Sequence, residues 1–91
     1  MFTYNFPEYK GLVSVQEQVT KIGFEYMEIA EEALKSIIDP VSVALECLDT
    51  IHACETLLRV LQQEHGIDVQ AEAEFIEKKN AERGYYGEQQ A

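Results

Sequence analysis

Two long runs of apolar residues with helical spacing, separated by Asp39-Pro40, constrain the fold of this chain more than any other feature. In the first run the apolar residues recur in steps of three and four: Val19, Ile22, Tyr26, Ile29, Ala33 and Ile37. In the second run the corresponding residues are Ala44, Cys47, Leu48, Ile51, Cys54, Leu58 and Leu61. Such spacing places each set on one face of an α-helix. The sequence therefore predicts two amphipathic helices, each with one buried apolar stripe.

Residues with known preferences for helix ends predict where these helices begin and end. Ser14 followed by Glu17 is a capping-box pattern and starts the first helix. The residue before a proline is disfavoured in the α region, so Asp39-Pro40 is expected to end this helix and begin the next. The second helix is expected to span about residues 41–64, with Gly66 at its C-terminal cap.

The remaining segments are shorter. An aromatic-rich irregular arm covers residues 1–10, a third helix is expected over about 68–82, and 87–91 reads as a flexible polar tail. Ninety-one residues make one small domain, 1–91. Two long helices joined by a short turn form an antiparallel hairpin, which has few other apolar elements to pack against. We therefore expect an all-α fold in which hairpins from several copies form a four-helix bundle, as a dimer or tetramer.

The net charge of the chain limits the classes of partner that it can bind. Seventeen acidic residues against seven basic ones give a net charge of −10, which disfavours nucleic acid as a partner. Three of the bases, Lys78, Lys79 and Arg83, gather near the C-terminal end, an arrangement that suits a small anionic ligand beside an acidic metal site. The chain shows no signal-peptide pattern and no apolar run of about 20 residues. We expect a cytoplasmic protein with no membrane partner.

Two pairs of acidic residues stand at corresponding places on the two long helices. Glu25 and Glu28 lie on the first, in line with Lys21, and Glu46 and Asp49 lie on the second. Residues three apart on a helix are neighbours, so each pair can converge on one ion, and folding the hairpin brings the pairs to similar heights. Carboxylates suit Mg²⁺. An ordinary solvated acidic face has the same spacing, and spacing alone leaves both interpretations open.

The segments that carry these acids resemble the MazG-like nucleotide pyrophosphohydrolases, all-helical proteins with an E-x-x-E motif, a spacer and an E-x-x-D motif. Residues 21–29 (KIGFEYMEI) supply the first motif with a lysine before it, and 46–49 supply the second after a spacer of seventeen residues. Residues 79–86 (KNAERGYY) are similar to the K-N-x-x-R-G-Y ending of short MazG-like chains. The resemblance covers about residues 15–86.

The resemblance implies a Mg²⁺-dependent enzyme, with Mn²⁺ as a substitute, that converts a nucleoside triphosphate to the monophosphate and pyrophosphate. The implied metal-binding and catalytic residues are Glu25, Glu28, Glu46 and Asp49, and the implied nucleotide contacts are Lys21, Lys79, Asn80 and Arg83. Family members commonly carry two adjacent glutamates at the first motif, where this chain has Phe24-Glu25. Glu31 or Glu32 therefore stays open as a replacement for Glu25.

The sequence is also compatible with two other functions. The missing glutamate and the small size of the chain are also typical of a non-catalytic helical interaction module that retains the MazG-like fold. A di-iron carboxylate bundle is weaker, because such sites use Glu-x-x-His pairs and neither histidine here has that spacing. His52 follows Asp49 by three residues and is either a group that orients this ligand or a structural histidine.

Overall fold

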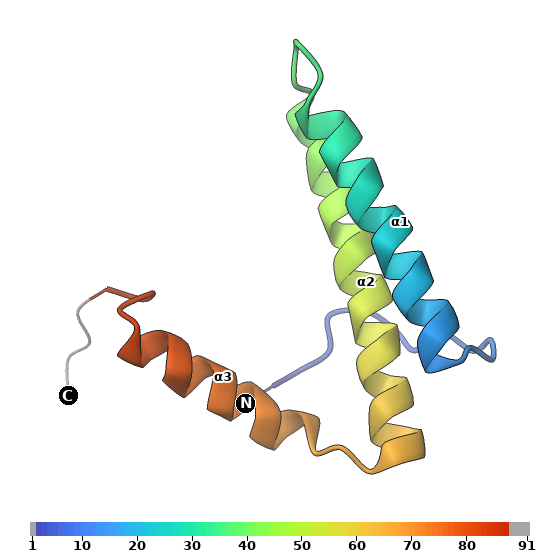
Figure 1. Cartoon of the computed structure of the whole chain (residues 1–91), viewed down its shortest axis with the longest axis vertical. Coiled ribbons are helices and arrows are strands. Elements are labelled where there is room, and N and C mark those ends of the chain that lie inside the picture. Colours follow the sequence, from blue (N-terminus) through green and yellow to red (C-terminus); the bar gives the residue numbers. More distant parts are fainter. Residues whose placement is uncertain (1, 88–91) are drawn as a thin grey trace.

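The computed structural model describes residues 2–87 and contains three α-helices preceded by an irregular arm (Figure 1). Helix α1 spans Val15–Ala33, α2 spans Pro40–His65 and α3 spans Val69–Glu82. The described residues form no strand, which confirms the predicted all-α class. Of the predicted flexible tail, residues 88–91 lie outside the described part of the chain. None of the helices in the described part is long and apolar enough to cross a membrane.

The predicted helix caps are present. The Ser14 hydroxyl accepts the Glu17 N–H at 3.0 Å, while the Ser14 N–H donates to the Glu17 carboxylate at 3.2 Å. These two bonds form the capping box that starts α1. Gly66 ends α2 with a left-handed φ of 67°, a conformation that favours glycine. These ends follow from local interactions, so the sequence was sufficient to predict them.

The first helix ends earlier than predicted. Continuation to Asp39-Pro40 is wrong: α1 stops at Ala33, and residues 34–39 form the connection to α2. Ile37, the last residue of the predicted stripe, is 88% exposed in this connection. A β-branched residue such as Ile37 loses side-chain freedom in a helix and gains no burial here in return, because it lies beyond the end of the opposite helix.

Most residues of the two predicted apolar stripes are exposed, while Ile22, Ile29, Leu58 and Leu61 are half-buried. Val19 and Tyr26 on α1 are 53% and 65% exposed. On α2, Ala44, Cys47, Leu48, Ile51 and Cys54 are all exposed. The contact between the helices uses a mixed face instead, where the buried Gln18 donates its side-chain N–H to the Ala53 carbonyl at 2.9 Å. Periodicity shows which residues share a face, but not which neighbour covers that face.

The hairpin and α3 do not form a compact body. Helices α1 and α2 lie antiparallel along their length, whereas α3 leaves the far end of α2 and points away from the hairpin (Figure 1). The radius of gyration is 15.8 Å, against about 12 Å for a compact chain of this length. Among the described apolar side chains only Ala53 and Val69 are buried. A single copy therefore has very little core of its own.

A network of polar and aromatic contacts fastens the N-terminal arm to α2. The buried Glu55 carboxylate accepts the backbone N–H groups of Asn5 and Phe6 at 2.9–3.0 Å and the Asn5 side-chain amide at 2.8 Å. Arg59 donates to the Phe6 carbonyl at 2.7 Å and lies 4.0 Å from the centre of the Tyr4 ring. Burial of a carboxylate is tolerable here because its oxygens are satisfied by several donors.

Replacement of this carboxylate should loosen the arm. We expect Glu55→Gln to lower the free energy of unfolding by about 1–3 kcal/mol, because an amide nitrogen then faces the buried N–H groups of Asn5 and Phe6. The measurement is urea unfolding followed by circular dichroism. Glu64→Gln, an exposed change on the same helix, is the control. An equal decrease in the free energy of unfolding in the two variants would contradict the role assigned to Glu55.

The same contacts make part of the stability depend on pH. Burial acts to raise the pKa of Glu55, but the hydrogen bonds from Asn5 and Phe6 and the Arg59 charge together lower this pKa below its ordinary value. A lowered folded-state pKa gives stabilisation that is complete above the ordinary value and lost as the pH falls through the lowered one. We expect the difference in melting temperature between wild type and Glu55→Gln to be largest at neutral pH and to shrink in acid.

Candidate metal centre

Three carboxylates from two helices converge on one point of the hairpin. Glu25, Glu28 and Glu46 each place one oxygen within 4.8 Å of the others. The three-residue spacing sets Glu25 and Glu28 one turn apart on the same side of α1. The antiparallel path of α2 then brings Glu46 beside them. The structure thus brings together three of the four side chains predicted to bind metal; we call these three the acidic cluster.

The acidic cluster combines two half-buried carboxylates, Glu25 and Glu46, with the exposed Glu28. One carboxylate oxygen of Glu25 and one of Glu46 are shielded from solvent and have no hydrogen-bond partner. The pKa of Glu46 is raised, first by the hydrogen bond it shares with Glu28, then by burial and by the charges of Glu28, Asp49 and Glu25. Shielded like charges are costly unless a proton or a cation compensates them. A divalent ion would supply that compensation.

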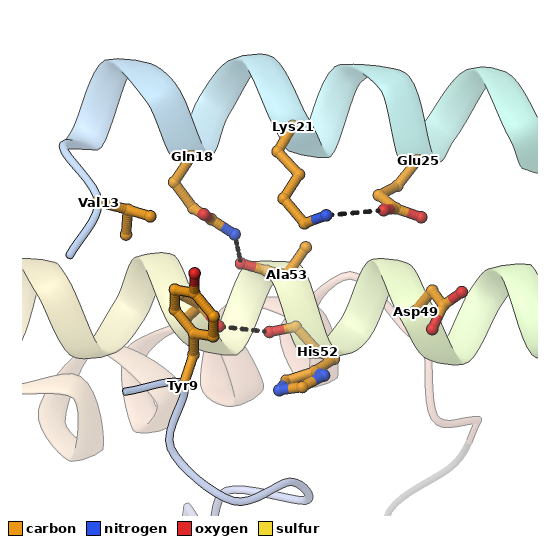
Figure 2. Close-up of a pocket in the computed structure, with 9 residues that line it drawn as sticks. Tyr9, Val13, Gln18, Lys21, Glu25, Asp49, His52 and Ala53 are labelled. Atoms are coloured by element: carbon orange, nitrogen blue, oxygen red, sulfur yellow. Dashed lines mark hydrogen bonds and ion pairs between the residues drawn. The ribbon is translucent and has the colours of Figure 1, made fainter. Parts of the chain in front are cut away.

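Lys21 lies at the edge of the acidic cluster, as its position in the predicted strip requires. Its ammonium group is 3.4 Å from a Glu25 oxygen, one turn along α1 (Figure 2). The Lys21 side chain is 60% exposed, whereas that of Glu25 is only 13% exposed. The exposed Lys21 ammonium group can also be reached by an anionic ligand from solvent.

Asp49 is the predicted ligand that the structure does not place in the acidic cluster. It is exposed, and it lies on α2 across from Glu25 at the wall of an adjoining pocket (Figure 2). The pocket has a volume of about 420 Å³ and opens between α1, α2 and the arm. Its lining consists of Tyr9, Val13, Gln18, Lys21, Glu25, Asp49, His52, Ala53 and Thr56. The acidic cluster and the pocket therefore share a wall.

Five residues of this pocket were not expected from the sequence, with Gln18 and Tyr9 among them. Gln18 stands three residues before Lys21 and seven before Glu25, so continuing the helical strip backwards would have found it. Tyr9 gives no such signal, because the path of the arm depends on its contacts with Glu55 and Arg59.

His52 has a structural contact in this pocket. Its ring stacks on Phe6, with centroids 4.9 Å apart and planes inclined by 23°. The Nε2 atom of His52 is shielded and has no hydrogen-bond partner in the described structure. The stacking supports the structural interpretation of this histidine.

The other predicted nucleotide contacts lie elsewhere in the chain. Lys79 and Asn80 are in the last turn of α3 and Arg83 follows directly, at the end of the helix that points away from the hairpin (Figure 1). Within one copy they are not part of the acidic cluster or of the pocket beside it.

The alternative ligands on α1 are also outside the acidic cluster. Glu31 is exposed, and Glu32 pairs with Lys35 at 2.9 Å. Glu25 is the residue that meets Glu28 and Glu46. The geometry therefore favours Glu25 over both alternatives.

The chain matches no protein-family model, no curated protein and no solved structure. The resemblance to MazG-like enzymes therefore stays a prediction that rests on the motifs. The chemistry of the site follows from its own residues and their geometry.

Proposed function

We propose that the chain is a Mg²⁺-dependent nucleoside triphosphate pyrophosphohydrolase that releases pyrophosphate and a nucleoside monophosphate. The observation that supports this best is the convergence of Glu25, Glu28 and Glu46, two of which hold shielded oxygens without partners. An all-oxygen set of carboxylates fits Mg²⁺, which retains several waters and binds substrate phosphates directly. Mn²⁺ is the expected substitute. Asp49, at the wall shared with the pocket, adds a fourth carboxylate on the substrate side.

We assign different parts of the nucleotide to different residues around the acidic cluster. Glu25, Glu28 and Glu46 would hold the ion, which when bound neutralises phosphate charge and activates water for attack. Lys21 is placed to exchange its contact with Glu25 for a phosphate oxygen. The adjoining pocket, at about 420 Å³, lies within the usual 300–1,000 Å³ range of small-molecule sites. In this proposal the nucleoside part of the substrate binds in that pocket.

We further propose that two hairpins pair into a four-helix bundle, as a dimer or as half of a tetramer. The apolar stripes of α1 and α2 are exposed on a single copy, with Tyr26, Leu48 and Ile51 at 65%, 47% and 41% exposure. Pairing of such faces is the usual way that helical hairpins complete a core.

The deciding experiment is product analysis by ³¹P NMR. Ribo- and deoxyribonucleoside triphosphates are incubated with the protein and Mg²⁺ or Mn²⁺. Pyrophosphate and monophosphate are the expected products. Orthophosphate and diphosphate would point to a different cleavage. No turnover of any nucleotide by the folded protein would overturn the proposal.

A non-catalytic interaction module is the second candidate. It is favoured by the position of Asp49 outside the acidic cluster and by the large exposed apolar stripes. A module of this kind should bind its partner equally well as wild type and as Glu46→Gln. Its melting temperature should also be unchanged by Mg²⁺ or nucleotide.

A further inference from the structure

We propose that the site is shared between two copies, with α3 of one copy carrying its basic end to the acidic cluster of the other. The inference rests on the proposed function for the role of the acidic cluster. It adds that each site is incomplete within a single chain.

The acidic cluster and α3 lie towards opposite ends of the hairpin. Glu46 is close to the start of α2, and α3 follows after His65 at its end. Nineteen residue steps separate Glu46 from His65 and span about 28 Å of helix. Helix α3, about 21 Å long for its fourteen residues, then points away from the hairpin (Figure 1). Lys79 and Arg83 therefore do not reach the acidic cluster of their own chain.

Within the described residues, ion pairs are found in the arm and the hairpin but not on α3. Lys10, Lys21 and Lys35, in the arm and hairpin, each lie 2.9–3.7 Å from a glutamate oxygen. Within residues 2–87 no ion pair is formed by Lys78, Lys79 or Arg83. At the end of α3 these three bases outnumber Glu77 and Glu82 beside them, so this end carries a small net positive charge that can face an acidic cluster.

The apolar face of α3 is also open. Between α3, the end of α2 and the arm lies a hollow of about 770 Å³, lined mainly by apolar side chains such as Phe2, Leu58 and Ile76, together with Glu72 and Glu77. Leu58 belongs to the predicted stripe of α2, so the hollow continues the exposed apolar surface of the hairpin. The Phe2 N–H donates to the Gln70 side chain and fixes the first turn of α3 to the arm.

The exposed area is large enough for a stable pairing. A compact protein of 10.4 kDa exposes about 5,400 Å², whereas this chain exposes 7117 Å². The difference exceeds the roughly 800 Å² that each partner buries in a standard interface.

A second copy fits this surface in one orientation. A two-fold pairing brings the same stripe of each hairpin together. If the hairpins run antiparallel, the end of one from which α3 leaves lies beside the end of the other that holds the acidic cluster. In this orientation α3 would extend towards the partner's acidic cluster, and the two acidic clusters would stay apart. Parallel pairing would bring the acidic clusters together and leave both α3 helices away from them.

The first test is cross-linking, which does not depend on activity. In a background with Cys47→Ala and Cys54→Ala, one copy carries Glu31→Cys beside the acidic cluster and another carries Glu82→Cys on α3. After joint refolding, a short bismaleimide should yield a cross-linked dimer from the mixture and much less from either variant alone. A chain carrying both substitutions that cross-links within a monomer would overturn the inference. So would a mixture that yields no cross-linked dimer.

The second test is complementation between inactive copies. Glu46→Gln lacks a ligand and Arg83→Ala lacks the basic contact, so each alone should be weakly active. In a mixed dimer the intact acidic cluster of one copy meets the intact α3 of the other. Random mixing should restore about one quarter of wild-type activity, since half of the two-fold dimers carry one complete site each. Activity no greater than the mean of the separate variants would overturn the inference.

The two tests separate failure of the inference from failure of the proposed function. Cross-linking without any nucleotide turnover by wild type would support the arrangement of copies and overturn the enzymatic role. Turnover by wild type without cross-linking or complementation would support the enzymatic role and show that each site belongs to one chain.

Discussion

Glu46→Gln is expected to reduce kcat/KM for pyrophosphate release about a hundredfold or more, because it removes the one α2 carboxylate of the acidic cluster. An amide oxygen carries no charge and holds Mg²⁺ less well than a carboxylate. The variant should fold normally, since the substitution also relieves repulsion from Glu25 and Glu28. The measurement is initial rates across nucleotide and Mg²⁺ concentrations.

Glu31→Gln is the matched control for this loss. It makes the same chemical change at an exposed position one turn beyond Glu28, outside the acidic cluster. It should retain wild-type rates. Mg²⁺ should raise the melting temperature of wild type and Glu31→Gln, because an ion that binds only the folded state stabilises it. If Mg²⁺ raised the melting temperature of Glu46→Gln as much as that of wild type, the ion would have to bind outside the acidic cluster.

Leu48→Glu is expected to dissociate the oligomer and to lower its stability by about 2–4 kcal/mol, the loss typical of a central interface residue. On a single copy Leu48 is 47% exposed, so within one chain a glutamate there would be tolerated. In a paired bundle the same carboxylate would be buried against the partner without a counter-charge. Light scattering after size exclusion measures the mass, and thermal unfolding measures the stability.

Leu34→Glu provides the comparison for this variant. Leu34 follows the end of α1 and is 84% exposed, away from both predicted stripes. The same substitution there should leave the mass and the melting temperature close to wild type. If Leu48→Glu behaved like Leu34→Glu, the α2 stripe would be an ordinary exposed surface.

The sequence by itself determined the features that depend on residues close together along the chain. The capping box at Ser14 and Glu17 and the left-handed cap at Gly66 were predicted because each acts within one helical turn. The three-residue spacing of Glu25 and Glu28 placed them on one side of α1, where both belong to the acidic cluster. These are properties of a helix and its ends, whichever surface covers the helix.

Only the tertiary structure decided which faces meet. Most residues of the apolar stripes are exposed, while Gln18 is buried against the Ala53 carbonyl. Helix α1 stops at Ala33 because no opposite surface would bury Ile37. Asp49 lies outside the acidic cluster, although its spacing from Glu46 matches that of Glu25 from Glu28. Periodicity fixes an angle around one helix axis, whereas burial also depends on the path of the neighbouring segments, which local spacing does not encode.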